Sequence, residues 1–241
     1  MTIDYAKGLT FAFQDKDWLS KLGKAALWTF ISMLLFFIPL YFFALGYGLD
    51  TARNIMKGKE NPLPDLDDIG AIFKDGARFF VVTLVYGSPT FILYCIMFAV
   101  LISAGAFAGD IDEDALGAAM GGGVLAIQCL MYIFGFILAF LMPAIMTRYI
   151  QTDDIRESLN VGAVLATARE HFLPCLMILL MYFASSFIFG IAFMLSFITI
   201  CGWIFVYFAG IPWLSAVLGH LVGQFANELD NPENKLDSVA F

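Results

Sequence analysis

The stretch that decides the fold is FLPCLMILLMYFASSFIFGIAFMLSFITI (residues 172–200), followed after one cysteine by GWIFVYFAGIPWLSAVLGHLVGQFA (residues 202–226). Neither run contains Asp, Glu, Lys or Arg. A helix needs about 20 apolar residues to cross the roughly 30 Å hydrocarbon core of a bilayer, and both runs exceed that length. Backbone polar groups in lipid must be hydrogen-bonded within their own segment. The two runs therefore predict two membrane helices joined by a tight turn.

Three further uncharged apolar runs lie upstream, namely Ala25–Leu49, Phe79–Phe107 and Gly122–Thr147. Hydrophobic residues make up 61% of the 241 residues and charged residues 14%, against roughly 45–50% and about 25% in soluble domains. These values exclude a soluble domain, a disordered chain and a disulfide scaffold. The runs also lack the period-two alternation of outer-membrane strands. We therefore predict an all-α polytopic transmembrane helix bundle over residues 25–226, with four to five crossings.

The polar parts of the chain predict amphipathic helices at the membrane interface. Residues 1–24 combine four Lys with apolar residues at helical spacing, which is typical of a helix lying on a membrane surface. Gly70–Phe80 and Gly162–Phe172 have the same pattern, and we expect each to lie along the membrane plane before the next run enters it. Residues 227–241 are expected to form a polar C-terminal tail.

The distribution of Lys and Arg predicts the topology, because these residues are enriched in cytoplasmic loops. The loop Asp50–Arg78 carries 5 of them and the loop Arg148–His171 carries 3, whereas the acidic connection Ala108–Gly121 carries none. We expect the two basic loops and the C-terminus to be cytoplasmic and the acidic connection to face the opposite side.

The first run leaves three interpretations open. The run Ala25–Leu49 contains Pro39 near its middle and Gly46 and Gly48 after it. A chain that enters the membrane, reverses at Pro39 and leaves on the same side would keep every Lys and Arg cytoplasmic. The alternatives are five plain spans with the N-terminus outside, or five with the N-terminus inside.

Six basic residues flank the predicted helices on the cytoplasmic side. Their side chains are long enough to anchor helices by reaching the interface. The functional alternative is a site for lipid headgroups or phosphate at the inner mouth of the bundle. The residues are Arg53, Lys74, Arg78, Arg148, Arg156 and Arg169.

Within the predicted spans, ionisable side chains are nearly absent, which argues against an intramembrane enzyme or an ion-coupled carrier. His220 is the exception, and with Gln224 it forms a polar pair one helical turn apart. Hydrogen bonding between helices explains this pair, with a proton-responsive site as the alternative. No catalytic motif occurs, the four cysteines offer no metal-binding spacing, and no polybasic run suggests nucleic acid. We therefore expect no catalytic, metal or cofactor site.

Several short motifs resemble the domain-of-unknown-function 4013 family. They are Gly46-Tyr47 followed by Arg53, then Leu63-Pro64-Asp65, Phe73-x-Asp75-Gly76 and His220-x-x-Gly223-Gln224. The resemblance extends over about residues 4–228. It implies a bacterial or archaeal multi-pass membrane protein, located in the cytoplasmic membrane, and it supplies no catalytic residue because the family has no established activity.

Two functions from different classes fit these observations. The first is a non-enzymatic scaffold or a subunit of a membrane assembly, with membrane lipids and membrane proteins or a second copy as partners. The second is a small transporter or channel for a neutral or lipidic solute, which kinked helices and a re-entrant segment would suit. A dry bundle with an exposed apolar face favours the scaffold, whereas a polar cavity favours transport.

Overall fold

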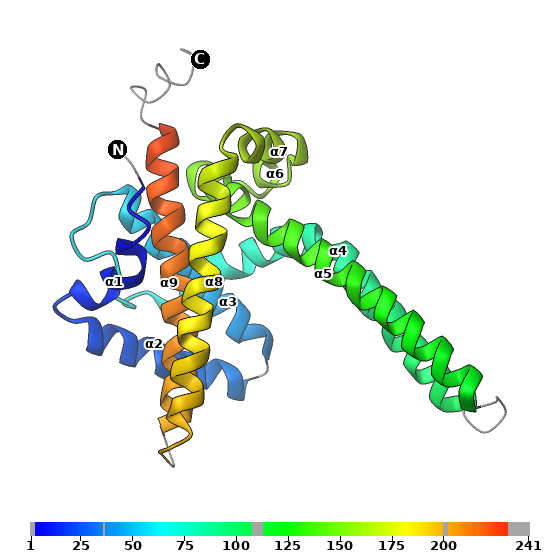
Figure 1. Cartoon of the computed structure of the whole chain (residues 1–241). Helices are drawn as coiled ribbons and strands as arrows, with labels where there is room; N and C mark the ends of the chain where they lie inside the picture. Colours follow the sequence, from blue (N-terminus) through cyan, green and yellow to red (C-terminus); the bar gives the residue numbers. More distant parts are fainter. Residues whose placement is uncertain (1–2, 36, 108–112, 200–201, 231–241) are drawn as a thin grey trace. The chain divides into compact units, whose positions relative to one another are not determined.

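The computed structural model describes residues 3–35, 37–107, 113–199 and 202–230 (Figure 1). Within these residues the chain forms helices and no strand, so the predicted all-α class is confirmed. In chain order the helices are α1 (Lys7–Gln14), α2 (Trp18–Leu34), α3 (Phe37–Met56), α4 (Ile69–Phe107), α5 (Glu113–Thr152), α6 (Ile155–Ser158), α7 (Val161–Glu170), α8 (Phe172–Ser196) and α9 (Gly202–Asp230).

Four of the described helices have stretches that are long and apolar enough to cross a membrane. These stretches are Ile69–Ser103 of α4, Gly121–Thr152 of α5, Phe172–Ser196 and Gly202–Asp230. The chain is thus a multi-pass membrane protein, as the sequence predicts. Helix α9 continues to Asp230, so the first residues of the predicted tail are helical, and residues 231–241 lie outside the described part.

The apolar run Ala25–Leu49 is divided between two helices. Helix α2 ends at Leu34 and α3 begins at Phe37, so the chain breaks before Pro39 and not at it. Pro39 is the third residue of α3, a position where a backbone N–H has no partner within the helix, so the missing N–H costs nothing. A single straight helix over this run is therefore wrong. The side of the bilayer on which each end lies stays a prediction.

Residues 1–24 do not form one helix either. A turn separates α1 from α2, and it forms because the carboxylate of Asp15 accepts a hydrogen bond from the backbone N–H of Asp17 at 2.9 Å. Asp side chains favour such turns because they bind the backbone two residues on. The predicted interfacial segment is thus α1 together with the first turns of α2.

The other two predicted interfacial helices differ from each other. Gly70–Phe80 is not a separate helix, because α4 continues without a break from Ile69 to Phe107. Gly162–Phe172 does form a separate helix, α7, which ends where the backbone turns at His171 (φ −114°, ψ 44°). Their orientation to the bilayer stays a prediction.

The acidic connection Ala108–Gly121 is shorter than predicted, because α5 begins at Glu113. The alanine-rich stretch that follows favours a helix over a loop. Residues 108–112, which include Asp110 and Asp112, lie outside the described part.

The chain divides into two compact units. The main unit comprises the described residues of Met1–Val82 and Met142–Phe241, and the hairpin unit is Thr83–Leu141. In the main unit, α1, α2, α3 and α8 all pack against α9. The last helix is therefore the element around which this unit is built.

Glycines bring α3 and α9 into backbone contact. A Cβ at Gly219 of α9 would overlap the carbonyl oxygen of Gly48, and one at Gly223 would lie 2.6 Å from the carbonyl oxygen of Ala52. Small residues four apart on both helices permit this approach, as is common between membrane helices. On another side of α3, a Cβ at Gly76 of α4 would overlap the carbonyl oxygen of Phe42. Small side chains thus fix the position of α3.

Lys21 joins the start of α2 to the link between α3 and α4 through one buried and one exposed carboxylate. The ammonium group of Lys21 lies 3.1 Å from the Asp15 carboxylate and 2.8 Å from that of Asp65, and it donates to the carbonyl of Leu63 at 3.3 Å. The Asp15 side chain is only 1% exposed. A charge buried this deeply requires its partner.

The hairpin unit consists of the second part of α4 and the first part of α5, which lie side by side (Figure 1). A Cβ at Gly87 would lie 3.7 Å from the side chain of Leu138. Large apolar side chains of both helices are exposed, as expected for a surface in lipid. The most exposed include Phe91, Phe98, Ile102, Leu125 and Tyr132.

A proline lies within α4 without ending it. Pro89 has no N–H to donate to the carbonyl of Val85, but the hydroxyl of Ser88 donates to that carbonyl at 2.8 Å. Membrane helices tolerate prolines where a serine hydroxyl replaces the missing backbone donor in this way. The helix therefore continues through the hairpin unit.

Candidate functional site

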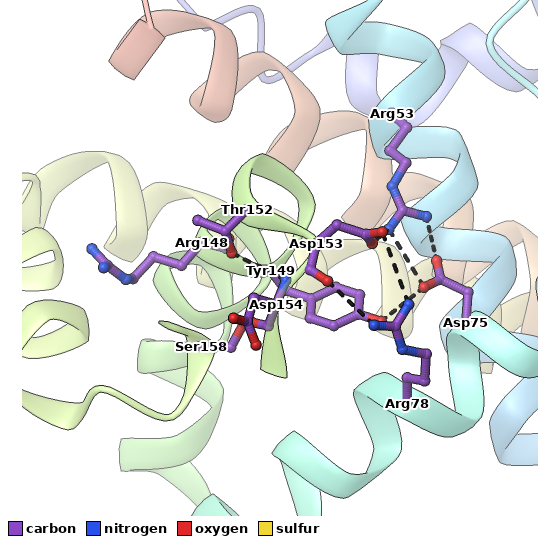
Figure 2. A network of polar contacts seen from close by, with 9 residues as sticks. All are labelled: Arg53, Asp75, Arg78, Arg148, Tyr149, Thr152, Asp153, Asp154 and Ser158. Atoms are coloured by element: carbon purple, nitrogen blue, oxygen red, sulfur yellow. Dashed lines mark hydrogen bonds and ion pairs between the residues drawn. The ribbon is translucent and has the colours of Figure 1, made fainter. Parts of the chain in front are cut away.

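The polar centre of the main unit is a cluster of charged side chains from three segments (Figure 2). Arg53 comes from the last turn of α3, and Asp75 and Arg78 come from α4. Tyr149 lies near the end of α5, and Asp153 follows that helix directly. The sequence analysis predicted only the two arginines as site residues.

Arg53 is the hub of this cluster. Its guanidinium group forms a two-pronged ion pair with the Asp75 carboxylate and reaches the Asp153 carboxylate at 2.9 Å. The Tyr149 hydroxyl donates to the Asp75 carboxylate at 2.8 Å. Arg78 donates to the backbone carbonyl of Asp153 at 3.3 Å. One arginine thus connects α3, α4 and the end of α5.

Local backbone geometry presents Asp153 to Arg53. Asp153 has a φ of 53°, a left-handed conformation that Asp tolerates better than most residues. Its N–H donates to the carbonyl of Tyr149 at 2.9 Å. The next residue, Asp154, begins α6 by accepting the N–H of Arg156 at 2.8 Å. The corner between α5 and α6 is therefore held by hydrogen bonds on both sides of Asp153.

The electrostatics keep Arg53 charged. Burial alone would lower the pKa of the Arg53 guanidinium group, but the hydrogen bond to Asp75 and the charges of Asp75 and Asp153 outweigh it, so its pKa lies above the ordinary value. The guanidinium plane also lies over the Tyr149 ring, 5.9 Å from its centre. The positive charge of Arg53 is therefore available to both the Asp75 and the Asp153 carboxylate.

A cleft of about 530 Å³ opens beside the cluster, between α3, α4 and the link that joins them. Its lining includes charged residues of both signs. Among them, Lys57, Lys59 and Lys74 are exposed lysines. An exposed ammonium group can meet a phosphate without breaking a buried ion pair. The lysines are thus the side chains of this cleft best suited to an anionic headgroup.

The predicted basic residues do not all converge on the cleft. Arg53, Lys74 and Arg78 line it. Arg148 instead pairs with Glu157 at 3.3 Å, and Arg169 lies in the last turn of α7. The structure thus brings three of the five predicted headgroup contacts together in one cleft and places Arg148 and Arg169 outside it. Headgroup binding by any of the five stays a prediction.

Sequence reasoning missed the acidic and aromatic partners of the cluster. Asp75 stands in the motif Phe73-x-Asp75-Gly76, which was the one available signal. Asp153 and Tyr149 carry no sequence signal, because they lie about a hundred residues from Arg53. Among the described residues, no three His, Cys, Asp or Glu side chains are placed to hold a metal ion.

The predicted polar pair His220 and Gln224 lies elsewhere in the main unit. The Gln224 amide nitrogen is 2.9 Å from Nδ1 of His220, and its amide oxygen accepts the N–H of Asp4 at 2.7 Å. The sequence analysis expected hydrogen bonding between helices, and the structure places the backbone of Asp4, ahead of α1, as the partner of Gln224. The pair holds the N-terminal segment on α9.

We expect the substitution Asp75→Asn to lower the free energy of unfolding by about 1–3 kcal/mol, the cost of leaving a partly buried donor unpaired. The Asp75 carboxylate accepts hydrogen bonds from both Arg53 and Tyr149. An asparagine has one amide oxygen that accepts and one amide nitrogen that can only donate, so it cannot replace both acceptors. The measurement is denaturant unfolding in mixed micelles. The matched control is Asp67→Asn, an exposed aspartate of the same cleft; equal effects of the two substitutions would contradict the role of the cluster.

The substitution Asp50→Asn should stabilise the protein, in contrast to Asp75→Asn. Burial raises the pKa of the Asp50 carboxyl, although Lys59, Arg53 and Lys57 partly oppose it. The folded chain therefore binds this proton more tightly than the unfolded chain, and stability rises as the pH falls through the folded-state pKa. We expect Asp50→Asn to raise the melting temperature at about pH 7 and to match the parent near pH 4, the ordinary Asp range. A pH-independent difference between the two proteins would refute this assignment.

Comparison with known proteins adds one match. A protein-family model described as "Protein of unknown function (DUF4013)" matches residues 30–201 of the chain. Neither the curated proteins nor the solved structures give a significant match.

Proposed function

We propose, since the chain belongs to the DUF4013 family of proteins of unknown function, that it is a non-enzymatic subunit or scaffold of a membrane assembly. The chain is an integral membrane protein, and its role has to be inferred from its own surfaces. The proposal rests on the hairpin unit.

The hairpin unit offers an apolar surface with room for another helix. In the most apolar stretch of α4 no residue is buried, and in that of α5 11% are, against 17% in α8 and 44% in α9. Gly121, Gly122 and Gly123 of α5 have nothing within 4 Å of where a Cβ would lie. Glycine weakens a helix, and in membrane helices its usual benefit is the close approach of a second helix. This exposed surface is the observation that carries the proposal.

The serine hydroxyls of the described spans are hydrogen-bonded within their own helices. The hydroxyls of Ser103, Ser185, Ser186 and Ser215 each donate to a backbone carbonyl of their own helix. The charged cluster around Arg53 is satisfied by its own ion pairs. Groups already used in this way do not supply a nucleophile or a chain of solute contacts. This arrangement supports a structural role over catalysis.

Lipid headgroups are the partners that the cleft beside Arg53 fits. Lys57, Lys59 and Lys74 would meet phosphate groups at the membrane surface, with the C-terminus cytoplasmic and the chain in the cytoplasmic membrane of a prokaryote. Each lysine near an anionic surface contributes about 1 kcal/mol to membrane binding. Anchoring and scaffolding are compatible, because a cleft that holds lipid also fixes the depth of the main unit.

A second candidate, transport of a neutral or lipidic solute, is favoured by one cavity of the main unit. The cavity measures about 420 Å³ and lies between α3, α8, α9 and the adjoining turns of α4 and α5. Its lining is mainly apolar, with the rings of Tyr41, Tyr182 and Tyr207. A cavity of this kind suits an acyl chain better than a hydrated solute.

Photo-crosslinking in native membranes tests the scaffold proposal. A photoreactive phenylalanine analogue replaces Phe98 of α4 or Phe136 of α5, both exposed in the hairpin unit. The matched control replaces Phe187 of α8, which is 71% exposed. We expect protein adducts of defined mass from the hairpin positions and lipid adducts alone from Phe187. An adduct of doubled mass identifies a second copy as the partner.

The same experiment can contradict the proposal. If both hairpin positions give only lipid adducts, the hairpin surface faces lipid and the scaffold function is wrong. If a lipid co-purifies in a fixed ratio and Leu214→Trp, which fills the apolar cavity, removes it, the transport candidate gains support.

A further inference from the structure

A hydrogen-bonded chain from His220 to the N-terminal segment forms a second polar feature of the main unit. Phe11 of α1 stacks on the His220 ring with a centroid distance of 4.2 Å, and both side chains are buried. Helix α1 lies close against α9, because a Cβ at Gly8 would come 2.8 Å from the Leu221 side chain. Residues 3–14 thus lie against the last helix, with Gly8, Phe11 and Ala12 buried, and one of these contacts involves a titratable ring.

The direction of each hydrogen bond in this chain is fixed. An amide nitrogen can only donate, so Nδ1 of His220 accepts from Gln224 at 2.9 Å and carries no proton. The imidazole is therefore neutral, with its proton on Nε2. The Gln224 amide oxygen accepts the Asp4 N–H at 2.7 Å, and its nitrogen lies 3.4 Å from the Asp4 carbonyl oxygen. In this orientation the Gln224 amide donates to the neutral ring and accepts from the Asp4 backbone at the same time.

Protonation of the ring breaks this match. A proton on Nδ1 would face the N–H groups of Gln224. Two donors would then meet, and the hydrogen bond between the ring and the amide would be lost. Rotating the amide by half a turn places its oxygen on the charged ring, and such a charge-assisted bond is stronger than a neutral one. The rotated amide then presents N–H groups to the Asp4 N–H and oxygen to the Asp4 carbonyl. Both contacts between Gln224 and the N-terminal segment are lost.

The ring can be reached by protons. His220 lines a cleft between the N-terminal segment, the end of α3 with the link after it, and α9. The charged and titratable groups that face this cleft are Asp4, Tyr5 and Lys7 from the N-terminal segment, Lys59 and Glu60 from the link after α3, and Asp230 from α9. None of the cleft residues comes from α2 or α8.

The geometry points to a proton-operated latch: neutral His220 holds residues 3–14 on α9 through Gln224, and protonated His220 releases them. The stacked Phe11 ring tolerates either charge state, because a cation over an aromatic face is also favourable. The switch therefore lies in the amide of Gln224. Acid opens the cleft that the N-terminal segment covers.

Hydrogen–deuterium exchange of the full chain in lipid nanodiscs tests the latch. Exchange of the peptide covering residues 4–14 is compared at about pH 8 and about pH 4, on both sides of the ordinary His pKa of about 6.5, after correction for the intrinsic amide rates. We expect roughly tenfold faster exchange at the lower pH, the size of effect that loss of a hydrogen bond produces. Peptides from residues 43–52 of α3 should not change.

Variants assign the response to the ring. His220→Asn keeps an acceptor near the position of Nδ1 but cannot take up a proton, and it should abolish the response. The chain contains two histidines, so His171→Asn is the matched control and should retain it. Gln224→Met removes the amide. Residues 4–14 of this variant should exchange at about pH 8 as fast as the same residues of the unsubstituted protein do at about pH 4.

Three results would overturn the latch. They are a parent protein whose segment exchanges equally at both pH values, a His220→Asn variant that responds as the parent does, and a Gln224→Met variant as protected as the parent at the higher pH. If His220→Asn does not fold, Gln224→Met compared at both pH values decides the question, because a latch that acts through Gln224 leaves this variant without a pH response.

Discussion

Replacing Gly219 with alanine lowers the free energy of unfolding by about 1–3 kcal/mol, the usual cost of overpacking, and replacing it with leucine prevents α3 from packing on α9. The added Cβ overlaps the carbonyl oxygen of Gly48. That oxygen is part of the facing backbone, so it cannot rotate away as a side chain would. The helices have to separate, and the neighbouring contact of Gly223 with Ala52 is lost with them.

The matched control is Gly190→Ala in α8, where nothing lies within 4 Å of the new methyl group. Since alanine favours a helix over glycine by about 1 kcal/mol, this substitution is neutral or stabilising. Both proteins are measured by reversible unfolding in mixed detergent micelles. Equal destabilisation by the two alanines would mean that α3 and α9 do not touch at Gly219.

The substitution Lys21→Met is expected to cost about 3–5 kcal/mol, because it leaves the buried Asp15 carboxylate without a counter-charge. Burial alone would lower the pKa of the Lys21 ammonium, but hydrogen bonds with Asp65 and Asp15 outweigh it and raise the pKa. The stabilisation is therefore fully present below the ordinary Lys pKa of about 10.4 and is lost only as the pH rises through the folded-state value. The expected loss is thus the same at pH 6 as at pH 8, within about 0.5 kcal/mol.

A second substitution separates the charge from the packing. Asp15→Asn in the Lys21→Met background removes the buried charge and keeps the oxygen that caps the turn at Asp17, so it should restore most of the lost stability. Lys16→Met, at an exposed position next to the turn, should change little. If the double variant is no more stable than Lys21→Met, the aliphatic stem of Lys21 and not its charge holds the turn.

The membrane class and the long helices could be predicted from the sequence because the long apolar runs contain no charged residue and all charged residues lie between or beyond them. Phe172–Ser196 and Gly202–Asp230 lie almost where the apolar runs place them. The break between Leu34 and Phe37 could not be predicted, since an apolar run has the same composition whether one helix or two form from it. The helices on both sides of this break, α2 and α3, pack against α9, which is far away in the sequence.

The candidate site was only half predictable for a related reason. Basic residues at helix ends are visible as a charge pattern, so Arg53, Lys74 and Arg78 were identified. The loops contain many Asp and Glu residues, and no sequence pattern distinguishes Asp75 or Asp153 from the others. The close glycine contacts were equally hidden, because a glycine that meets a backbone looks the same in sequence as one that meets nothing.

The position of α9 at the centre of the main unit has a consequence for biosynthesis. Helices α1, α2 and α3 all pack against a helix that is synthesised well after them, and Asp4 is separated from its partner Gln224 by 220 residues. At about 5–20 residues per second, the first segment waits roughly 10–45 s for its binding surface. During that time the apolar faces of α2 and α3 need lipid or an insertion factor. Nascent chains that stop before α9 lack the helix against which α1, α2, α3 and α8 all pack.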